Sequence, residues 1–182
     1  QTMGDAANSI SLAATGQSEA VIGHVLISAT NLMATHFLPP VLKKLRTTAP
    51  DLKIEIIASN ELSDLRRREA DIAIRHSRPK DETLFAKRLR DTKAHLFASK
   101  EYLDEVGRPK TLADLEKLKF VGFDQPELRL GLMASRGVNL TTENFNFSTS
   151  SATLTLELVR QGFGIGILPI EIGVDYPELE NP

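Results

Sequence analysis

Three short polar segments carry the side chains in this sequence that are best suited to binding chemistry. The segments are Ser28-Ala29-Thr30-Asn31, Ser59-Asn60 and Ser148-Thr149-Ser150-Ser151. Each one opens a predicted helix, where hydroxyl groups and unbonded backbone N–H groups meet the positive end of the helix dipole. This combination suits a small anion such as a carboxylate. The alternative for any single segment is simple N-capping, which these residue types perform in most helices.

The residue patterns that catalysis or metal binding would need are absent from the sequence. Cysteine is missing, which excludes disulfides, thiolate metal ligands and cysteine nucleophiles. Neither a G-x-S-x-G nucleophile elbow nor a phosphate-binding P-loop occurs. The histidines lack the spacing of metal ligands; they are His24, His36, His76 and His95. We therefore expect a binding protein with neither a metal nor a cofactor, and not an enzyme.

His76 is the histidine expected near a ligand, because it follows a predicted strand. The alternatives for it are a ligand contact and an ordinary loop histidine. A catalytic role would need a titratable partner, for which only Asp124 is conceivable. His24 and His95 alternate with apolar residues in predicted strands, so we expect them at surface or internally satisfied positions.

Two other conspicuous patterns have structural explanations. Gly162, Gly164 and Gly166 resemble a nucleotide-binding pattern, but they follow a helix and enter a strand, the reverse of the dinucleotide-binding order. Gly162 is therefore predicted to end the helix, and the other two to allow close packing. A charged run is predicted to form a solvated helix face with local ion pairs. Its members are Asp64, Arg66, Arg67, Arg68, Glu69 and Asp71.

The composition is that of an ordinary globular chain. The 182 residues are 41% hydrophobic and 25% charged, with a net charge of −2, so one domain or one compact pair of lobes is expected. Nucleic-acid affinity comes mainly from clustered cations, and base stacking needs aromatic side chains, which make up only 5% here. The chain by itself is therefore a poor candidate for binding DNA or RNA.

The first part of the chain alternates strands with helices. Strands are predicted at 21–29, 52–59 and 71–75, and helices at 30–49 and 59–70. Thr30 or Asn31 caps the first helix, and Pro39-Pro40 divides it into a short first turn and a main helix. Strands that alternate with helices of this length pair in parallel through right-handed crossovers. An α/β lobe is the result.

The rest of the chain has its own alternation of elements. Strands are predicted at 83–91, 94–99, 119–123, 145–148 and 163–169, helices at 99–107, 111–119 and 151–162, and a glycine-rich loop between 124 and 144. Two α/β lobes joined through an extended stretch predict a cleft. In such sheets, ligands bind outside the carboxyl ends of the strands. The polar segments described above lie at such ends.

Five stretches of this sequence resemble the effector-binding domain of LysR-type transcriptional regulators. They are VIGHVLISA, FLPPVLKKLRTTAPDLKIEI, DLRRREADIAIR, LFASKEYLDEVGRPKTLADLEKLKFVGF and LELVRQGFGIGILP, in unbroken order from about Val21 to Pro169. The ADIAIR and ASKEYL…GRP forms are most similar to the branch that contains many regulators responding to small aromatic or organic acids. The ordered set is more specific than any one stretch.

The resemblance implies an α/β fold of two Rossmann-like lobes around a cleft, the type II fold of periplasmic-binding proteins. It implies that residues 1–20 are the end of a linker helix and that 21–182 form the effector-binding domain. Lobe I would span about 21–77 together with the residues after 169. The crossing would span about 78–95 and lobe II about 96–168. Since the family adds a further strand and helix to lobe I, we expect its C-terminal part to be truncated here.

By position, the resemblance also implies the contacts of a small effector. These would be Thr30, Asn31, Ser59, Asn60, Arg75, His76, Phe123, Thr149, Ser150 and Ser151. Dimers through lobe I, and tetramers of the full-length protein, are implied as well. DNA would be bound only by a winged helix-turn-helix that this sequence does not contain.

The resulting hypothesis is a ligand-sensing domain of a cytoplasmic bacterial transcription factor, with no membrane partner. The effector is expected to be a small organic or aromatic acid. The alternatives are a periplasmic solute-binding protein of a transport system and a small enzyme built on the same scaffold.

Overall fold

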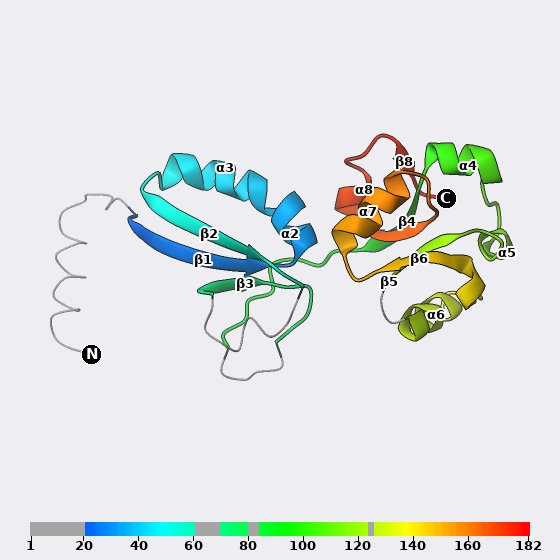
Figure 1. Ribbon diagram of the computed structural model, residues 1–182. Coiled ribbons are helices and arrows are strands. Elements are labelled where there is room, and N and C mark those ends of the chain that lie inside the picture. The colour runs from blue at the N-terminus through cyan, green and yellow to red at the C-terminus, as the bar shows by residue number, and fades with distance from the viewer. Residues whose placement is uncertain (1–20, 61–69, 80–83, 124–125) are drawn as a thin grey trace. The chain divides into compact units, whose positions relative to one another are not determined.

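The computed structural model describes residues 21–60, 70–79, 84–123 and 126–182 (Figure 1). Backbone contacts divide the chain between Arg75 and His76 into two compact parts, here called unit 1 and unit 2. The predicted linker at 1–20 and the central part of the predicted 59–70 helix lie outside the described residues. The same holds for Asp124 and for the charged run from Asp64 to Glu69.

Unit 1 is built on a parallel sheet of three strands in the order β2-β1-β3. The strands are β1 (Gly23–Ala29), β2 (Leu52–Ala58) and β3 (Ile72–Ile74). Ala29 at the end of β1 is level with Ala58 on one neighbour and with Ile74 on the other. Because of this register, all three strands end at the same edge of the sheet. The predicted strands and their parallel pairing are confirmed.

The helices α2 (Asn31–His36) and α3 (Leu38–Thr48) cover one face of this sheet (Figure 1). Leu38 packs against Ile27 and Ala29 of the central strand. Pro39 lies at the start of α3, where its missing N–H would have no helical partner in any case. The predicted division into a short first helix and a main helix is confirmed, with the break at Phe37 just before the two prolines.

The strands of unit 2 are β4 (Ala94–Ser99), β5 (Phe120–Phe123), β6 (Phe145–Thr149), β7 (Gly166–Pro169) and β8 (Leu179–Glu180). They form a three-stranded sheet in the order β7-β4-β8 and a two-stranded sheet of β5 and β6. β4 pairs antiparallel with β7 and with β8, and β5 pairs parallel with β6. A bridge between Phe120 and Ile165 links the two groups. The strands predicted at 94–99, 119–123, 145–148 and 163–169 are confirmed with small shifts of their ends.

The helices of unit 2 pack on these two sheets around an apolar core. They are α4 (Lys100–Val106), α5 (Leu112–Leu115), α6 (Pro126–Ala134), the short 3-10 helix η2 (Thr142–Asn144), α7 (Ala152–Arg160) and α8 (Ile170–Gly173). Leu103 of α4 and Ile165 have no exposed surface. They form one cluster with residues such as Phe120 and Met133.

Two predictions for this part of the chain are wrong. The strand predicted at 83–91 is absent from residues 84–91, where the Phe85 side chain is 98% exposed and the backbone pairs with no described strand. A strand forms only where its backbone groups pair with a neighbouring strand, and no described strand pairs with residues 84–91. The predicted glycine-rich loop contains α6, a helix that begins with Pro126 at its first position.

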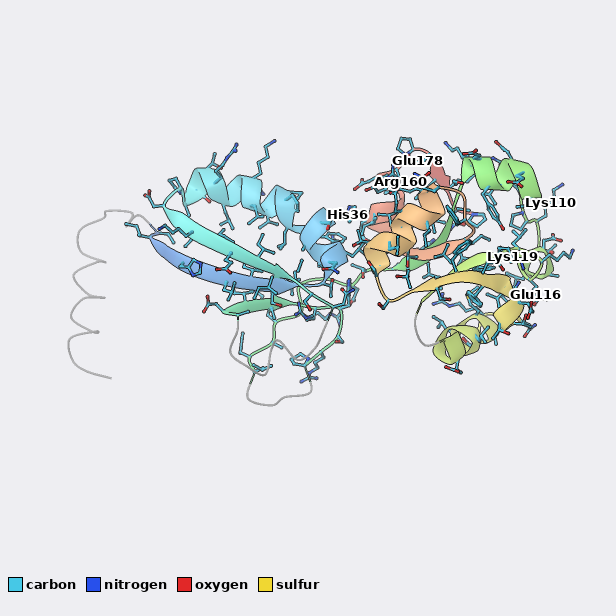
Figure 2. The ribbon with its side chains drawn as sticks, viewed as in Figure 1. His36, Lys110, Glu116, Lys119, Arg160 and Glu178 are labelled. Atoms are coloured by element: carbon cyan, nitrogen blue, oxygen red, sulfur yellow. The ribbon has the colours of Figure 1, made fainter. Side chains whose placement is uncertain are left out.

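The residues after 169, expected in lobe I, pack on unit 2 in this structure. β8 pairs with β4, and Arg108 Nε donates a hydrogen bond of 2.6 Å to Glu180 Oε1. Arg160 Nε lies 2.6 Å from Glu178 Oε1 (Figure 2), and the Arg160 guanidinium stacks 4.4 Å above the ring centroid of Tyr176. These contacts hold the segment from 176 to 180 against α4, α7 and β4.

The glycines near 162 have the structural roles predicted for them. Gly162 has a φ of +80°, and the N–H groups of Gly162 and Phe163 bond to the carbonyls of Val159 and Leu158, which closes α7 in a Schellman motif. A Cβ on Gly164 would lie 2.6 Å from the Lys119 carbonyl oxygen, and a Cβ on Gly166 would collide with Val159. Close backbone packing, rather than nucleotide binding, explains this pattern.

Candidate functional site

The carboxyl edge of the unit 1 sheet gathers half of the predicted effector contacts. Thr30 and Asn31 follow β1, Ser59 and Asn60 follow β2, and Arg75 follows β3. Because the three strands are parallel and end level with one another, these residues converge although they are far apart in the sequence. Two of the three polar segments thus lie at one sheet edge, and their contact with an effector stays a prediction.

Two of these side chains cap helix α2. Thr30 Oγ1 accepts a hydrogen bond of 3.4 Å from the Met33 N–H, and Asn60 Oδ1 accepts one of 3.2 Å from the Asn31 N–H. The capping alternative is therefore correct for Thr30. Asn60 supplies a second cap from the end of a different strand, which the sequence did not indicate. Both side chains thus tie the first turn of α2 to the sheet edge.

Arg75 places a permanent positive charge at the same edge. Its Nη2 donates a hydrogen bond of 2.7 Å to Ser28 Oγ, and its Nη1 donates one of 3.0 Å to the Ile74 carbonyl. Ser28 has no exposed surface, so its hydroxyl is a buried acceptor for the guanidinium. Such an edge can attract an anion electrostatically, and its neutral polar neighbours can donate hydrogen bonds.

In unit 2, four further candidates lie at the carboxyl edge of the β5–β6 pair. The backbone of Phe123 is level with Thr149, the last residue of β6. Thr149 Oγ1 accepts a hydrogen bond of 3.0 Å from the Ser151 N–H, and Ser151 Oγ accepts one of 3.2 Å from the Leu154 N–H. Ser151 is thus the N-cap of α7, while Ser150 is exposed. Like the edge of unit 1, this edge presents hydroxyl groups that accept hydrogen bonds from backbone N–H groups at the start of a helix.

The four histidines take up separate positions. His76, the first residue of unit 2, is exposed. His24 Nε2 lies 3.4 Å from Glu55 Oε2 with both side chains more than half exposed, and His95 is exposed on β4. His36 lies in the last turn of α2 (Figure 2). Within the described ranges, no group of three His, Asp or Glu side chains is placed to hold a metal ion.

One residue that sequence analysis placed in a solvated helix face has another role. Asp71 lies directly before β3, and its carboxylate Oδ2 accepts a hydrogen bond of 2.8 Å from the Leu26 N–H. Its own N–H donates to the Leu26 carbonyl at 2.9 Å. Asp71 is exposed, yet it serves the sheet rather than a local ion pair. The position of Asp71 immediately before the apolar run Ile72–Ile74 is the sequence feature that could have indicated this role.

The groups with shifted pKa values belong to structural networks of unit 2. Hydrogen bonds from Lys117 and Thr111 lower the pKa of Asp114 to about 2. Hydrogen bonds from its own N–H and from Arg160 lower the pKa of Glu178. Burial raises the pKa of Tyr102. Each of these shifts accompanies a cap, an ion pair or a core contact, and such networks perturb pKa values without catalysis.

Two hollows in unit 2 lie apart from the candidate residues. A core cavity of about 20 Å³ beside Phe120, Met133 and Thr155 has room for about one water molecule. A surface hollow of about 340 Å³ lies beside Pro109, Leu112 and Pro182. Neither is lined by a predicted effector contact.

Among the described helices, none has the length and apolar character to cross a bilayer.

Comparison with known proteins gives a consistent picture. A family model described as the LysR substrate binding domain matches residues 18–179. The chain is 27% identical over 147 residues to the transcriptional regulator CrgA of Neisseria meningitidis serogroup C (strain 8013), covering 80% of this chain and 49% of that protein. It is 25% identical over 151 residues to the transcriptional activator AaeR of Escherichia coli (strain K12), covering 82% of this chain and 49% of that protein. The chain thus spans about half the length of these relatives.

Solved structures share the fold. The regulatory domain of CrgA from Neisseria meningitidis matches with a TM-score of 0.76 at 24% identity, over 88% of this chain and 80% of that one. Full-length CbnR in complex with its target DNA matches with a TM-score of 0.65 at 16% identity, over 97% of this chain and 67% of that one. At these identities the likeness concerns the fold.

Proposed function

Because this chain belongs to the LysR substrate-binding domain family, we propose that it is the effector-sensing part of a transcription regulator. The observation that carries the proposal is the family match over residues 18–179, which includes both units. The relatives described above are named as transcriptional regulators, so a transport role is not favoured. The mixed α/β, type II periplasmic-binding-protein-like fold class is confirmed by its likeness to LysR regulatory domains.

The proposed effector is a small organic acid, aromatic or short-chain. The polar sheet edges of the two units supply its contacts: Thr30, Asn31, Ser59, Asn60 and Arg75 from unit 1, and His76, Phe123, Thr149, Ser150 and Ser151 from unit 2. Support comes from the convergence of the first five on one edge and from the charge of Arg75. In this proposal the protein acts by binding the effector and not by converting it.

Regulation by an effector requires two arrangements of the protein that bind it with different affinity. In the proposed function, a homodimer through the first lobe passes this difference to a DNA-binding domain outside the present sequence. The full-length protein would be a tetramer that works in the cytoplasm. Sequencing the reading frame upstream of the codon for Gln1 tests whether a DNA-binding domain precedes this part of the protein. A winged helix-turn-helix supports the regulator, whereas a signal peptide with a cleavage site contradicts it.

The effector site is tested by calorimetric titration with benzoate and with a panel of short carboxylic acids. The double variant Thr30→Ala with Ser150→Ala removes one hydroxyl from each unit. We expect at least tenfold weaker binding, because a hydrogen bond to a charged group contributes roughly 1.5–3 kcal/mol. The matched control is Thr47→Ala with Ser135→Ala, whose hydroxyls bond only to carbonyls of their own helical segments. Equal affinity of both double variants, or no binding by any acid, would contradict the site.

A further inference from the structure

Strand β3 is unusually weakly specified by its own sequence. It is three residues long, and its residues alternate Ile72, Ala73, Ile74. A shift of β3 by two residues along β1 would place Ile74 instead of Ile72 opposite Ile27, and each side chain would stay on the same face of the sheet. Only a shift by one residue reverses the faces of a strand, so the apolar pattern does not exclude the two-residue shift.

Two charged side chains bracket β3, one at each end, and both reach the central strand β1. At the start of β3, Asp71 Oδ2 accepts the hydrogen bond of 2.8 Å from the Leu26 N–H. At the end, Arg75 Nη2 donates the hydrogen bond of 2.7 Å to the buried Ser28 Oγ. Between them lie the pairs Ile27 with Ile72 and Ala29 with Ile74. A shift of two residues would remove both bonds at once.

We propose that Asp71 and Arg75 are a pair of register locks that select one pairing of β3 on β1. Arg75 is the last residue of unit 1, and the chain passes into unit 2 at His76. The locks therefore fix the point on the sheet from which the chain leaves unit 1. Arg75 is in this respect a positioning residue, whatever contact it makes with an effector.

Replacing Asp71 with asparagine distinguishes the effect of its hydrogen bond from the effect of its charge. In Asp71→Asn, an oxygen can still accept from the Leu26 N–H, whereas in Asp71→Ala no acceptor is left. We expect amide hydrogen exchange at Leu26 to become at least tenfold faster in Asp71→Ala, since a net hydrogen bond contributes about 1.5 kcal/mol. In Asp71→Asn it should stay within about threefold of the wild type. Unchanged protection in Asp71→Ala would overturn the lock at this end.

The register itself is measured by NMR on the whole labelled chain. In the double variant Asp71→Ala with Arg75→Met, we expect a second set of signals in which Ile27 has cross-strand contacts to Ile74 instead of Ile72. The matched control Asp91→Ala with Arg88→Met removes an exposed ion pair of 2.7 Å in unit 2 and should keep the single register. The proposal is overturned if the double variant keeps only the Ile27–Ile72 contact, or if Ile27 loses contact with β3 altogether. If the double variant does not fold, the exchange rates of the single variants decide.

Discussion

Single polar side chains hold the loops of unit 2, and Asn144 is a buried example. Its Nδ2 donates to the carbonyls of Glu116 and Leu118 at 2.8 and 2.9 Å, and its Oδ1 accepts from the Thr141 N–H at 2.8 Å. It is 8% exposed. Lys119 adds a hydrogen bond from Nζ to the Glu143 carbonyl (Figure 2). One amide thus joins the start of β5 to the start of β6.

Replacing Asn144 should therefore destabilise unit 2. We expect Asn144→Ala to lower the free energy of unfolding by about 2 kcal/mol, because buried carbonyls lose their donor. Asn144→Asp should cost more, since a carboxylate cannot donate to the two carbonyls. Urea denaturation measures both, with Asn139→Ala at an exposed position as the control. Equal stability of Asn144→Ala and wild type would contradict this role.

Asp114 predicts a pH dependence of stability. Its pKa in the folded protein is about 2, below the ordinary 3.8, because of Lys117 first and then Thr111. A lowered pKa adds stability above the unfolded value, and that stability is lost as the pH falls from about 4 towards 2. The difference in urea midpoint between wild type and Asp114→Ala should therefore be present at pH 7 and shrink across that window. A difference that stays constant from pH 7 down to pH 2 would contradict the assignment.

At the scale of elements, the pairing of strands and helices follows from patterns that the sequence displays. Apolar runs such as 21–29 and 94–99 predicted strands because burial on both faces leaves few polar positions. The run at 83–91 also resembles a strand, but a strand forms only where a neighbouring strand pairs with it, and that is a property of the assembled sheet. Helix α6 was not predicted, because Pro126 and Gly131 are residue types typical of loops.

The contact between α7 and β7 makes a prediction at this scale. A Cβ at Gly166 would collide with Val159 of α7. Gly166→Ala should lower the free energy of unfolding by about 1–3 kcal/mol through overpacking. Adding Val159→Ala should recover part of this loss, because the smaller side chain makes room. A double-mutant cycle by urea denaturation tests the coupling, and additive effects would contradict it.

The candidate site was predicted in part, for a physical reason. Thr30 and Ser59 were placed at one sheet edge because parallel strands end at a common edge, whereas Arg75 was named from the family resemblance. The hydrogen bonds of Asn60 to Asn31 and of Asp71 to Leu26 were not predicted, because they join residues far apart in sequence and depend on side-chain rotamers. The contacts of the ten candidates with an effector stay predictions.

At the scale of the whole molecule, the described residues form apolar clusters of different size in the two units. In the described part of the chain, the main buried cluster of unit 2 has ten residues and that of unit 1 has three. Apolar burial contributes most of the stability of a domain. Unit 1 should therefore open at lower urea concentration than unit 2.

Hydrogen exchange read by mass spectrometry can follow the two units separately. We expect peptides from β1 and β2 to lose protection before those from β4 and β7. Leu103→Ala should cost unit 2 about 2–5 kcal/mol and leave unit 1 unchanged, while Ile27→Ala should do the reverse. A single transition shared by all peptides would contradict independent units.

The antiparallel strand β4 has a consequence for how the protein is made. Its partners β7 and β8 emerge from the ribosome long after it does, whereas β1, β2 and β3 are neighbours in the order of synthesis. At bacterial elongation rates, β4 waits on the order of ten seconds for a partner. During that interval Leu96, Phe97 and Ala98 are an uncovered apolar strand, which is the kind of segment that chaperones bind. Unit 1 can complete its sheet during the same interval.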